Sequence, residues 1–215
     1  MAQSTNKGSG NSFIETPCVI ALDQSYSRTG IAVCVKGKVR KAYSVDLHKK
    51  VTGKNNFGGK TLKRKAVEAK LDKVINMCLT KFQPNEITVL VERIRTMTAS
   101  GEMRPNVIKA HAALIATIVD KAFEYGIRTY SVDTRCWKHA VLGDSRPIFE
   151  PIEGVENPQK FGSVRKAISL GFKEQMSIYS AKKGGFSSYN DDMADAICMS
   201  LYLFKGRPYK VKLEE

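Results

Sequence analysis

Four acidic residues in this sequence lie where carboxylates need a compensating partner. Asp23 directly follows an apolar run, and Glu92 lies near the end of another. Asp192 and Asp195 are three residues apart, so they share one face if the segment is helical. Buried carboxylates need a cation, an ion pair or hydrogen bonds. Because Mg²⁺ prefers a few carboxylates together with water and phosphate oxygens, these residues indicate a divalent-metal site that acts on phosphate.

Each of these acids also has an ordinary structural explanation. Asp23 could cap the turn after its strand, and Asp192 and Asp195 could compensate the dipole at a helix N-terminus. The protein is basic, and its acids lie at the ends of two strands and at the start of a helix. These positions together favour one shared metal site over a separate structural role for each acid. Asp191 is an alternative ligand to Asp192, although the D-x-x-D spacing to Asp195 favours Asp192.

The charge of the chain indicates a polyanionic partner. Lys and Arg number 35 against 21 Asp and Glu, which gives a net charge of +14. This excess favours nucleic acid first and an anionic membrane second. No basic amphipathic helix with a broad apolar face stands out, so we expect no membrane association. Two basic loops are expected, His48–Lys60 and Gly171–Ser188, and in the second loop Lys182 and Lys183 would contact the phosphate backbone.

The cysteines and histidines do not indicate a further metal site. The five cysteines form no C-x-x-C pair, and the three histidines lack zinc-ligand spacing. An odd number of cysteines without such spacing predicts free thiols in a reducing compartment. We therefore expect a cytoplasmic protein.

A mixed α/β arrangement is predicted to position the acids. The expected strands, which are rich in β-branched residues and bounded by turn residues, are Cys18–Leu22, Ile31–Val35, Lys38–Leu47, Glu86–Ile94 and Ile127–Val132. The first three form an antiparallel meander. The expected helices, which show apolar spacing or clear start and stop signals, are Thr61–Phe82, Asn106–Tyr125, Arg135–Leu142, Pro158–Leu170 and Asn190–Phe204.

The length of 215 residues suits one domain with elaborations. We expect a disordered polar lead-in over residues 1–16, one folded domain over 17–204 with an irregular insertion near 144–157, and a polar tail over 205–215. The helix Asn106–Tyr125 combines a wide apolar face with many alanines. Such a surface lets another helix approach closely, either in the core or across a dimer interface.

The chain resembles the RuvC-type Holliday-junction resolvases of the RNase H-like superfamily over roughly Val19–Leu203. The resemblance is carried by ALDQSYSRTGIAV, VLVERI, RCWKHAVLG, NPQKFGSVRKAI and DDMADAI. It implies an RNase H-like fold, with a mixed five-stranded sheet flanked by helices. The insertion near 144–157 and the long tails exceed the usual bacterial family core, which would fit a bacteriophage or mobile-element branch in a bacterial or phage-infected cell. The resemblance also implies that two Mg²⁺ ions, for which Mn²⁺ can substitute, are held by Asp23, Glu92, Asp192 and Asp195.

The resemblance implies a homodimeric endonuclease that resolves four-way DNA junctions in recombination and repair. Paired symmetric nicks made by two-metal hydrolysis would leave 5′-phosphate and 3′-hydroxyl ends, with Asp23 bridging the ions. Lys138 and Lys160 fall where this family places phosphate-contacting lysines. Arg95 stands where the family often has an aromatic residue near the junction centre, and its guanidinium can also stack on a base.

The sequence departs from the family at its first motif. Family members usually have D-P-G-x-x-x-x-G, whereas here Asp23 is followed by Gln24, Ser25 and Tyr26. Other hypotheses therefore stay open: an RNase H-like nuclease acting on flaps, hybrids or other branched DNA, or a non-catalytic DNA-structure-binding protein. An actin-like ATPase is disfavoured, because the chain is too short for two duplicated lobes.

Overall fold

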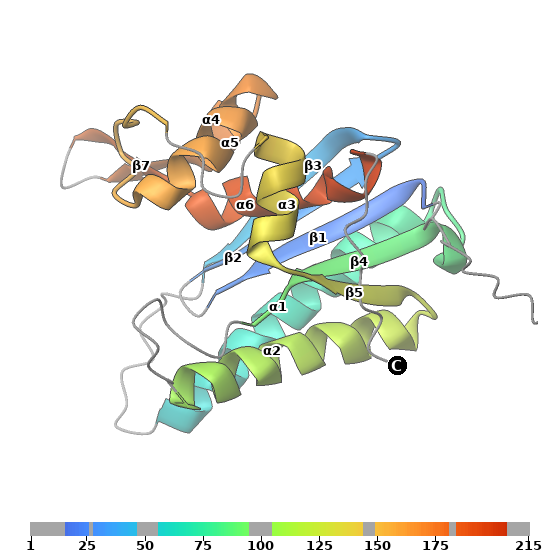
Figure 1. Ribbon diagram of the computed structural model, residues 1–215. Coiled ribbons are helices and arrows are strands. Elements are labelled where there is room, and N and C mark those ends of the chain that lie inside the picture. The colour runs from blue at the N-terminus through green and yellow to red at the C-terminus, as the bar shows by residue number, and fades with distance from the viewer. Residues whose placement is uncertain are drawn as a thin grey trace, which may run out of the picture.

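The computed structural model describes residues 16–25, 28–46, 56–94, 105–143, 149–180 and 184–205. A mixed sheet of five strands lies at the centre of the molecule, between two layers of helices (Figure 1). Outside these residues lie the predicted lead-in up to residue 15, most of the predicted loop 48–60, Arg95, Lys182, Lys183 and the C-terminal tail from residue 206.

The five strands of the central sheet are β1 (Cys18–Gln24), β2 (Arg28–Val35), β3 (Lys38–Asp46), β4 (Ile87–Glu92) and β5 (Arg128–Val132). Their order across the sheet is β3-β2-β1-β4-β5. β1 pairs antiparallel with β2, and β2 with β3, whereas β1 pairs parallel with β4, and β4 with β5. The predicted meander followed by parallel strands is therefore confirmed.

Helices cover both faces of the sheet. They are α1 (Asn56–Leu79), α2 (Pro105–Glu124), α3 (Thr134–Leu142), α4 (Phe161–Ser169), α5 (Lys173–Met176) and α6 (Asp191–Ser200). Short 3-10 turns occupy Pro84–Glu86, Pro158–Lys160 and Tyr202–Phe204. α1 and α2 lie side by side below the sheet in Figure 1, and α3, α4 and α6 lie above it. No helix in the described ranges is both long enough and apolar enough to span a bilayer.

The central strand β1 is buried on both sides, which explains why its sequence is a continuous apolar run. Cys18, Ile20 and Leu22 pack into the core shared with α1 and α2. Val19 and Ala21 point to the opposite face and pack with residues of α3 and α6. By the same alternation, Asp23 belongs to the face that α6 covers.

Two predicted segments differ in the structure. The helix α1 begins at Asn56, five residues before the predicted start, so it takes in the end of the predicted basic loop. The prediction of a basic loop over Gly171–Ser188 is wrong for the described residues of this segment. That segment contains α5 and a two-stranded antiparallel sheet of β6 (Ser177–Ser180) and β7 (Gly185–Tyr189).

Buried side chains explain this second difference. Phe172 and Met176 pack against α4 and α6 in a separate core cluster. On the hairpin, the Phe186 ring lies 4.8 Å from that of Tyr189 and 6.4 Å from that of Tyr179, between centroids. The aromatic contacts stabilise strands that are too short and too polar to stand out in the sequence.

Candidate metal centre

The ends of β1 and β4 bring two of the predicted acids to one edge of the sheet. The strands are parallel, and Leu22 pairs with Val91. Asp23 and Glu92 are therefore the next residues along neighbouring strands. Only 5% of Asp23 is exposed. Both acids were predicted from the same pattern, a buried strand that ends in an acid. The parallel pairing of β1 and β4 places them next to each other.

The N-terminus of α6 brings the other aspartates to the same place. The Asn190 side chain caps the helix by accepting a hydrogen bond from the main-chain N–H of Met193 at 3.0 Å. Gly30 pairs with Asp23 across β1 and β2. A Cβ atom on Gly30 would lie 2.2 Å from the main-chain oxygen of Asp192. The absence of a side chain at Gly30 therefore lets α6 approach the end of β1.

Three of the four predicted acids converge on the ammonium group of Lys160. Its Nζ lies 2.5 Å from Asp195 Oδ2, 3.5 Å from Asp23 Oδ2 and 3.8 Å from Asp192 Oδ1. Among the residues that the structure describes, no three acidic, histidine or cysteine side chains are close enough to share one metal ion. The three aspartates are instead arranged around a lysine.

The electrostatics of this cluster show that one lysine does not compensate it fully. Burial raises the pKa of Asp23 well above its ordinary value, although the positive charge of Lys160 opposes the shift. Burial also raises the pKa of Asp192 to about 6, again against the effect of Lys160. Burial alone would lower the pKa of Lys160, but the charges of Asp195 and Asp23 raise it well above the usual lysine value.

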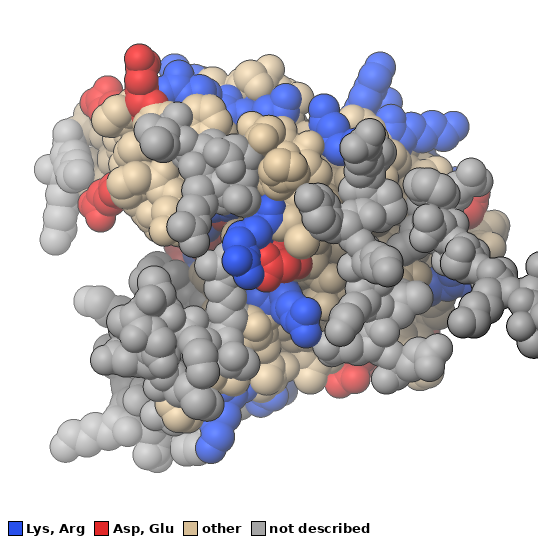
Figure 2. Space-filling view, in the orientation of Figure 1, with Lys and Arg blue, Asp and Glu red and all other residues tan. Residues whose placement is uncertain are grey.

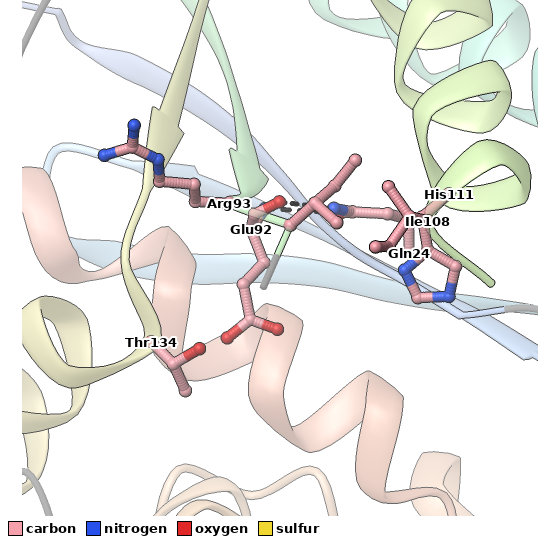
Figure 3. Close-up of a pocket in the computed structure, with 7 residues that line it drawn as sticks. Gln24, Glu92, Arg93, Ile108, His111 and Thr134 are labelled. Carbon is pink, nitrogen blue, oxygen red and sulfur yellow. Dashed lines mark hydrogen bonds between the residues drawn. The ribbon is translucent and has the colours of Figure 1, made fainter. Parts of the chain in front are cut away.

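The two residues that replace the family's Pro-Gly at the first motif both make contacts in the site. The Gln24 side chain donates to the main-chain oxygen of Glu92 at 2.5 Å and accepts from its N–H at 3.2 Å (Figure 3). It thus continues the β1–β4 ladder by one step. The Ser25 hydroxyl donates to Asp192 Oδ2 at 3.0 Å. Sequence analysis noted this departure but did not predict either contact.

The helix α3 supplies a partner for Glu92. The Asp133 side chain caps this helix, and Gly143, with φ of 88°, ends it. The fully buried Trp137 donates its indole N–H to Glu92 Oε1 at 3.3 Å. The tryptophan, absent from the predicted site, could have been suspected because a buried indole N–H needs an acceptor.

A pocket of about 220 Å³ lies beside Glu92. In Figure 3, Gln24 and His111 lie on one side of it, and the Glu92 carboxylate points toward Thr134 on the other. Burial lowers the pKa of His111, against the opposing charge of Glu92. Of the four predicted acids, Glu92 is the one that lines this pocket.

The remaining predicted residues lie as follows. Lys138 is buried, and its Nζ donates to the main-chain oxygen of Gln159 at 2.9 Å, so the phosphate contact implied for it stays a prediction. Asp191 is half-buried, but the ion pairs of Lys160 go to the other aspartates. The contacts predicted for Arg95, Lys182 and Lys183 lie outside the described residues.

The chemistry of the donor set fits a hard divalent cation. The converging side chains are all carboxylates, the ligand type that Mg²⁺ and Mn²⁺ favour. The oxygen Asp195 Oδ1 is buried without a hydrogen-bond partner. Mutual repulsion contributes to the raised pKa of Asp23, because Asp195, Glu92 and Asp192 all add to it. A divalent cation would give Asp195 Oδ1 a partner and would reduce the repulsion between the carboxylates.

The solved structures that match this chain include RuvC from a thermophilic bacterium, alone and with DNA. RuvC of Thermus thermophilus has a TM-score of 0.53 and 15% sequence identity, over 86% of this chain and 92% of that chain. The same bacterium's RuvC in complex with a Holliday junction substrate has a TM-score of 0.54 and 13% identity, over 86% and 90%. This chain has the RNase H-like fold of RuvC. No family model and no curated protein matches the sequence.

The fold expected from the resemblance is thus confirmed at a sequence identity too low to carry function by itself. The surface agrees with the charge of the chain. On the face drawn in Figure 2, lysine and arginine side chains gather along the upper edge, and others lie beside a small acidic patch near the centre. On this face, basic side chains therefore lie next to the acidic patch.

Proposed function

We propose that this chain is a divalent-metal-dependent endonuclease that resolves four-way DNA junctions by paired nicks, as in recombination and repair. The observation that carries the proposal is the convergence of Asp23, Asp192 and Asp195 at one edge of a RuvC-like sheet, beside Glu92. The RuvC complex with a Holliday junction supports branched DNA as the substrate class. A net charge of +14 suits a polyanionic ligand.

In this proposal the four carboxylates hold Mg²⁺ or Mn²⁺, with two ions in each site. The chemistry that a bound cation supplies is activation of water and neutralisation of charge on the phosphate. Ser25 orients the Asp192 carboxylate, Trp137 orients that of Glu92, and Gln24 fixes the main chain of Glu92. These neighbours limit the motion of the ligands, as supporting hydrogen bonds do in other metal sites.

The test is incubation with an end-labelled immobile four-way junction and, separately, a matched linear duplex, each with Mg²⁺ and with EDTA. We expect symmetric, metal-dependent nicks near the branch point and none in the duplex, with 5′-phosphate and 3′-hydroxyl ends. Equal cleavage of a flap or an RNA–DNA hybrid would instead indicate a broader RNase H-like nuclease. Tight binding without cleavage in Mg²⁺ or Mn²⁺ would favour a non-catalytic DNA-structure-binding protein.

Paired nicks require two active sites, and one surface of α2 suits a two-fold dimer. Its core-facing residues pack on the sheet and α1, whereas another stripe faces solvent. This stripe consists of exposed residues spaced by four, three and four positions: Ala112, Ala116, Val119 and Phe123. Val119 is 39% and Phe123 81% exposed. Alternating steps of four and three residues are the spacing by which two helices pack together along their length, and alanines permit close approach.

Replacing Phe123 by Asp is therefore expected to convert the dimer into a monomer. A charge within a helix–helix contact is unfavourable because it is desolvated without a partner. We expect at least about a 10-fold rise in the dimer dissociation constant, measured by light scattering and sedimentation across a concentration series. Junction cleavage should change from paired nicks to single, uncoupled nicks.

The matched control is Leu170→Asp, which places the same charge at another exposed apolar residue, away from α2. This variant should keep the oligomeric state of the original protein. A dimer that survives Phe123→Asp, or one that Leu170→Asp disrupts equally, would contradict the assignment of α2 as the interface.

A further inference from the structure

The arrangement of Lys160 inside the aspartate cluster has a consequence for metal binding. Its side chain is 19% exposed, and it contacts Asp195, whose side chain is 3% exposed, and Asp23, at 7%. Ion pairs this close and this sheltered are weakly screened by salt and much stronger than surface pairs. Lys160 is thus the positive charge that the described aspartates share.

The turn that carries Lys160 is held by several hydrogen bonds. The Asn157 side chain accepts from the N–H of Gln159 at 3.0 Å, and Lys138 donates to the carbonyl of Gln159 at 2.9 Å. The Ser163 hydroxyl donates to the carbonyl of Lys160 at 3.2 Å. Because its main chain is fixed in this way, only the flexible side chain of Lys160 has to move for the ammonium group to leave the cluster.

One ammonium group and a divalent cation compete for the same oxygens. Lys160 Nζ uses one carboxylate oxygen of each of its three partners, and Asp195 Oδ1 remains without a partner. A single positive charge leaves three carboxylates undercompensated, so a divalent cation is the better counter-ion. The two cannot occupy the centre together, because both need the space between these oxygens and they repel each other.

We propose that Lys160 is the resident counter-ion of the aspartate cluster and leaves it when a divalent cation binds. This inference rests on the proposed metal-dependent function. Lys160 would thus act before it contacts any phosphate. A metal ion must break the ion pairs of Lys160 in order to bind, and this cost lowers the apparent metal affinity of the DNA-free protein. A phosphate of bound DNA gives the displaced ammonium a new partner. By linkage, DNA therefore tightens metal binding and favours metal loading on the complex.

The first test measures Mn²⁺ binding to the DNA-free protein by calorimetry. We expect Lys160→Met to bind Mn²⁺ at least about 10-fold more tightly than the original protein, because the competing cation is gone. The matched control is Lys173→Met, which removes the same charge from an exposed position on α5 and should leave the affinity unchanged. Non-cleavable phosphorothioate junction DNA should tighten Mn²⁺ binding to the original protein more than to Lys160→Met.

The outcomes separate this inference from the proposed function. Equal or weaker Mn²⁺ binding by Lys160→Met would overturn the counter-ion role while leaving a metal-dependent nuclease in place. Absence of Mn²⁺ binding in both proteins would overturn the inference and the metal-dependent function together.

A second measurement uses the unaltered protein and so does not depend on a variant that folds. Acetylation of lysines is followed by mass spectrometry with and without saturating Mn²⁺. Lys160 should become several-fold more reactive when Mn²⁺ binds, because its ammonium group leaves the carboxylates. The buried Lys138 should stay unreactive in both conditions. Bound Mn²⁺ without any change at Lys160 would contradict the displacement.

Discussion

Replacing Asp192 by Asn is expected to slow cleavage strongly and, in the absence of metal, to make the protein more stable. The loss of one metal ligand should slow junction cleavage about 10²–10⁴-fold, since metal-based charge stabilisation contributes several kcal/mol. The gain in stability has a separate cause. Burial raises the pKa of Asp192 from 3.8 to about 6, but at pH 8 the carboxylate is still ionised. The folded state therefore contains a desolvated negative charge, which lowers the free energy of unfolding, and Asn carries no such charge.

The sign and the pH window follow from this shift. Each pKa unit corresponds to about 1.4 kcal/mol, so the penalty at pH 8 is at most about 3 kcal/mol and we expect Asp192→Asn to gain about 1–3 kcal/mol. A raised pKa means that the folded state binds the proton more tightly. The stabilising effect of protonation is complete below about pH 3.8 and is lost as the pH rises through about 6. Urea unfolding in EDTA at pH 8 and pH 4 should show the gain only at pH 8.

Asp191→Asn is the matched control, with the same change of charge one residue earlier. Asp191 is the first residue of α6, where a negative charge interacts favourably with the helix dipole. Its replacement should cost less than about 1 kcal/mol and preserve cleavage. If Asp191→Asn abolished cleavage and Asp192→Asn did not, Asp191 would be the ligand.

The sequence predicted the sheet because its strands combine strong local signals. β1 is a continuous β-branched and apolar run, which fits its position between two helix layers. The acids at the ends of β1 and β4 could also be predicted from local sequence. A carboxylate at the end of a buried apolar strand is unfavourable unless it has a function. Helix α3 was predicted closely because Asp133 and Gly143 are strong start and stop residues.

Features that depend on distant contacts could not be predicted in this way. Strands β6 and β7 are short, and their segment is rich in glycine, serine and lysine, so their pairing depends on packed aromatic rings. Gln24 contacts Glu92 across 68 positions of sequence, which no local pattern records. Lys160 was predicted to contact phosphate, but no spacing rule predicts that it lies between three aspartates.

Replacing Gly30 by Ala is expected to disturb both the fold and the candidate site. The new Cβ would lie 2.2 Å from the carbonyl oxygen and 2.5 Å from the carbonyl carbon of Asp192. These are main-chain atoms of a capped helix, so no side-chain rotation relieves the overlap and α6 itself must shift. Overpacking of this kind costs about 1–3 kcal/mol, occasionally more, which we expect to appear as a lower unfolding midpoint in urea.

The same shift should weaken metal binding and cleavage, because Asp192 and Asp195 both move with α6 while Asp23 stays on β1. We expect at least about a 10-fold loss of Mn²⁺ affinity, since each displaced ligand weakens a site that needs all its carboxylates at once. The assay is run well below the unfolding temperature of the variant, so that loss of folded protein does not contribute. Gly185→Ala is the control, because a Cβ at this strand position meets no atom within 4 Å. If Gly30→Ala had the same stability and the same Mn²⁺ affinity as the unaltered protein, that result would contradict the close approach of α6 to β2. The aspartate cluster depends on this approach.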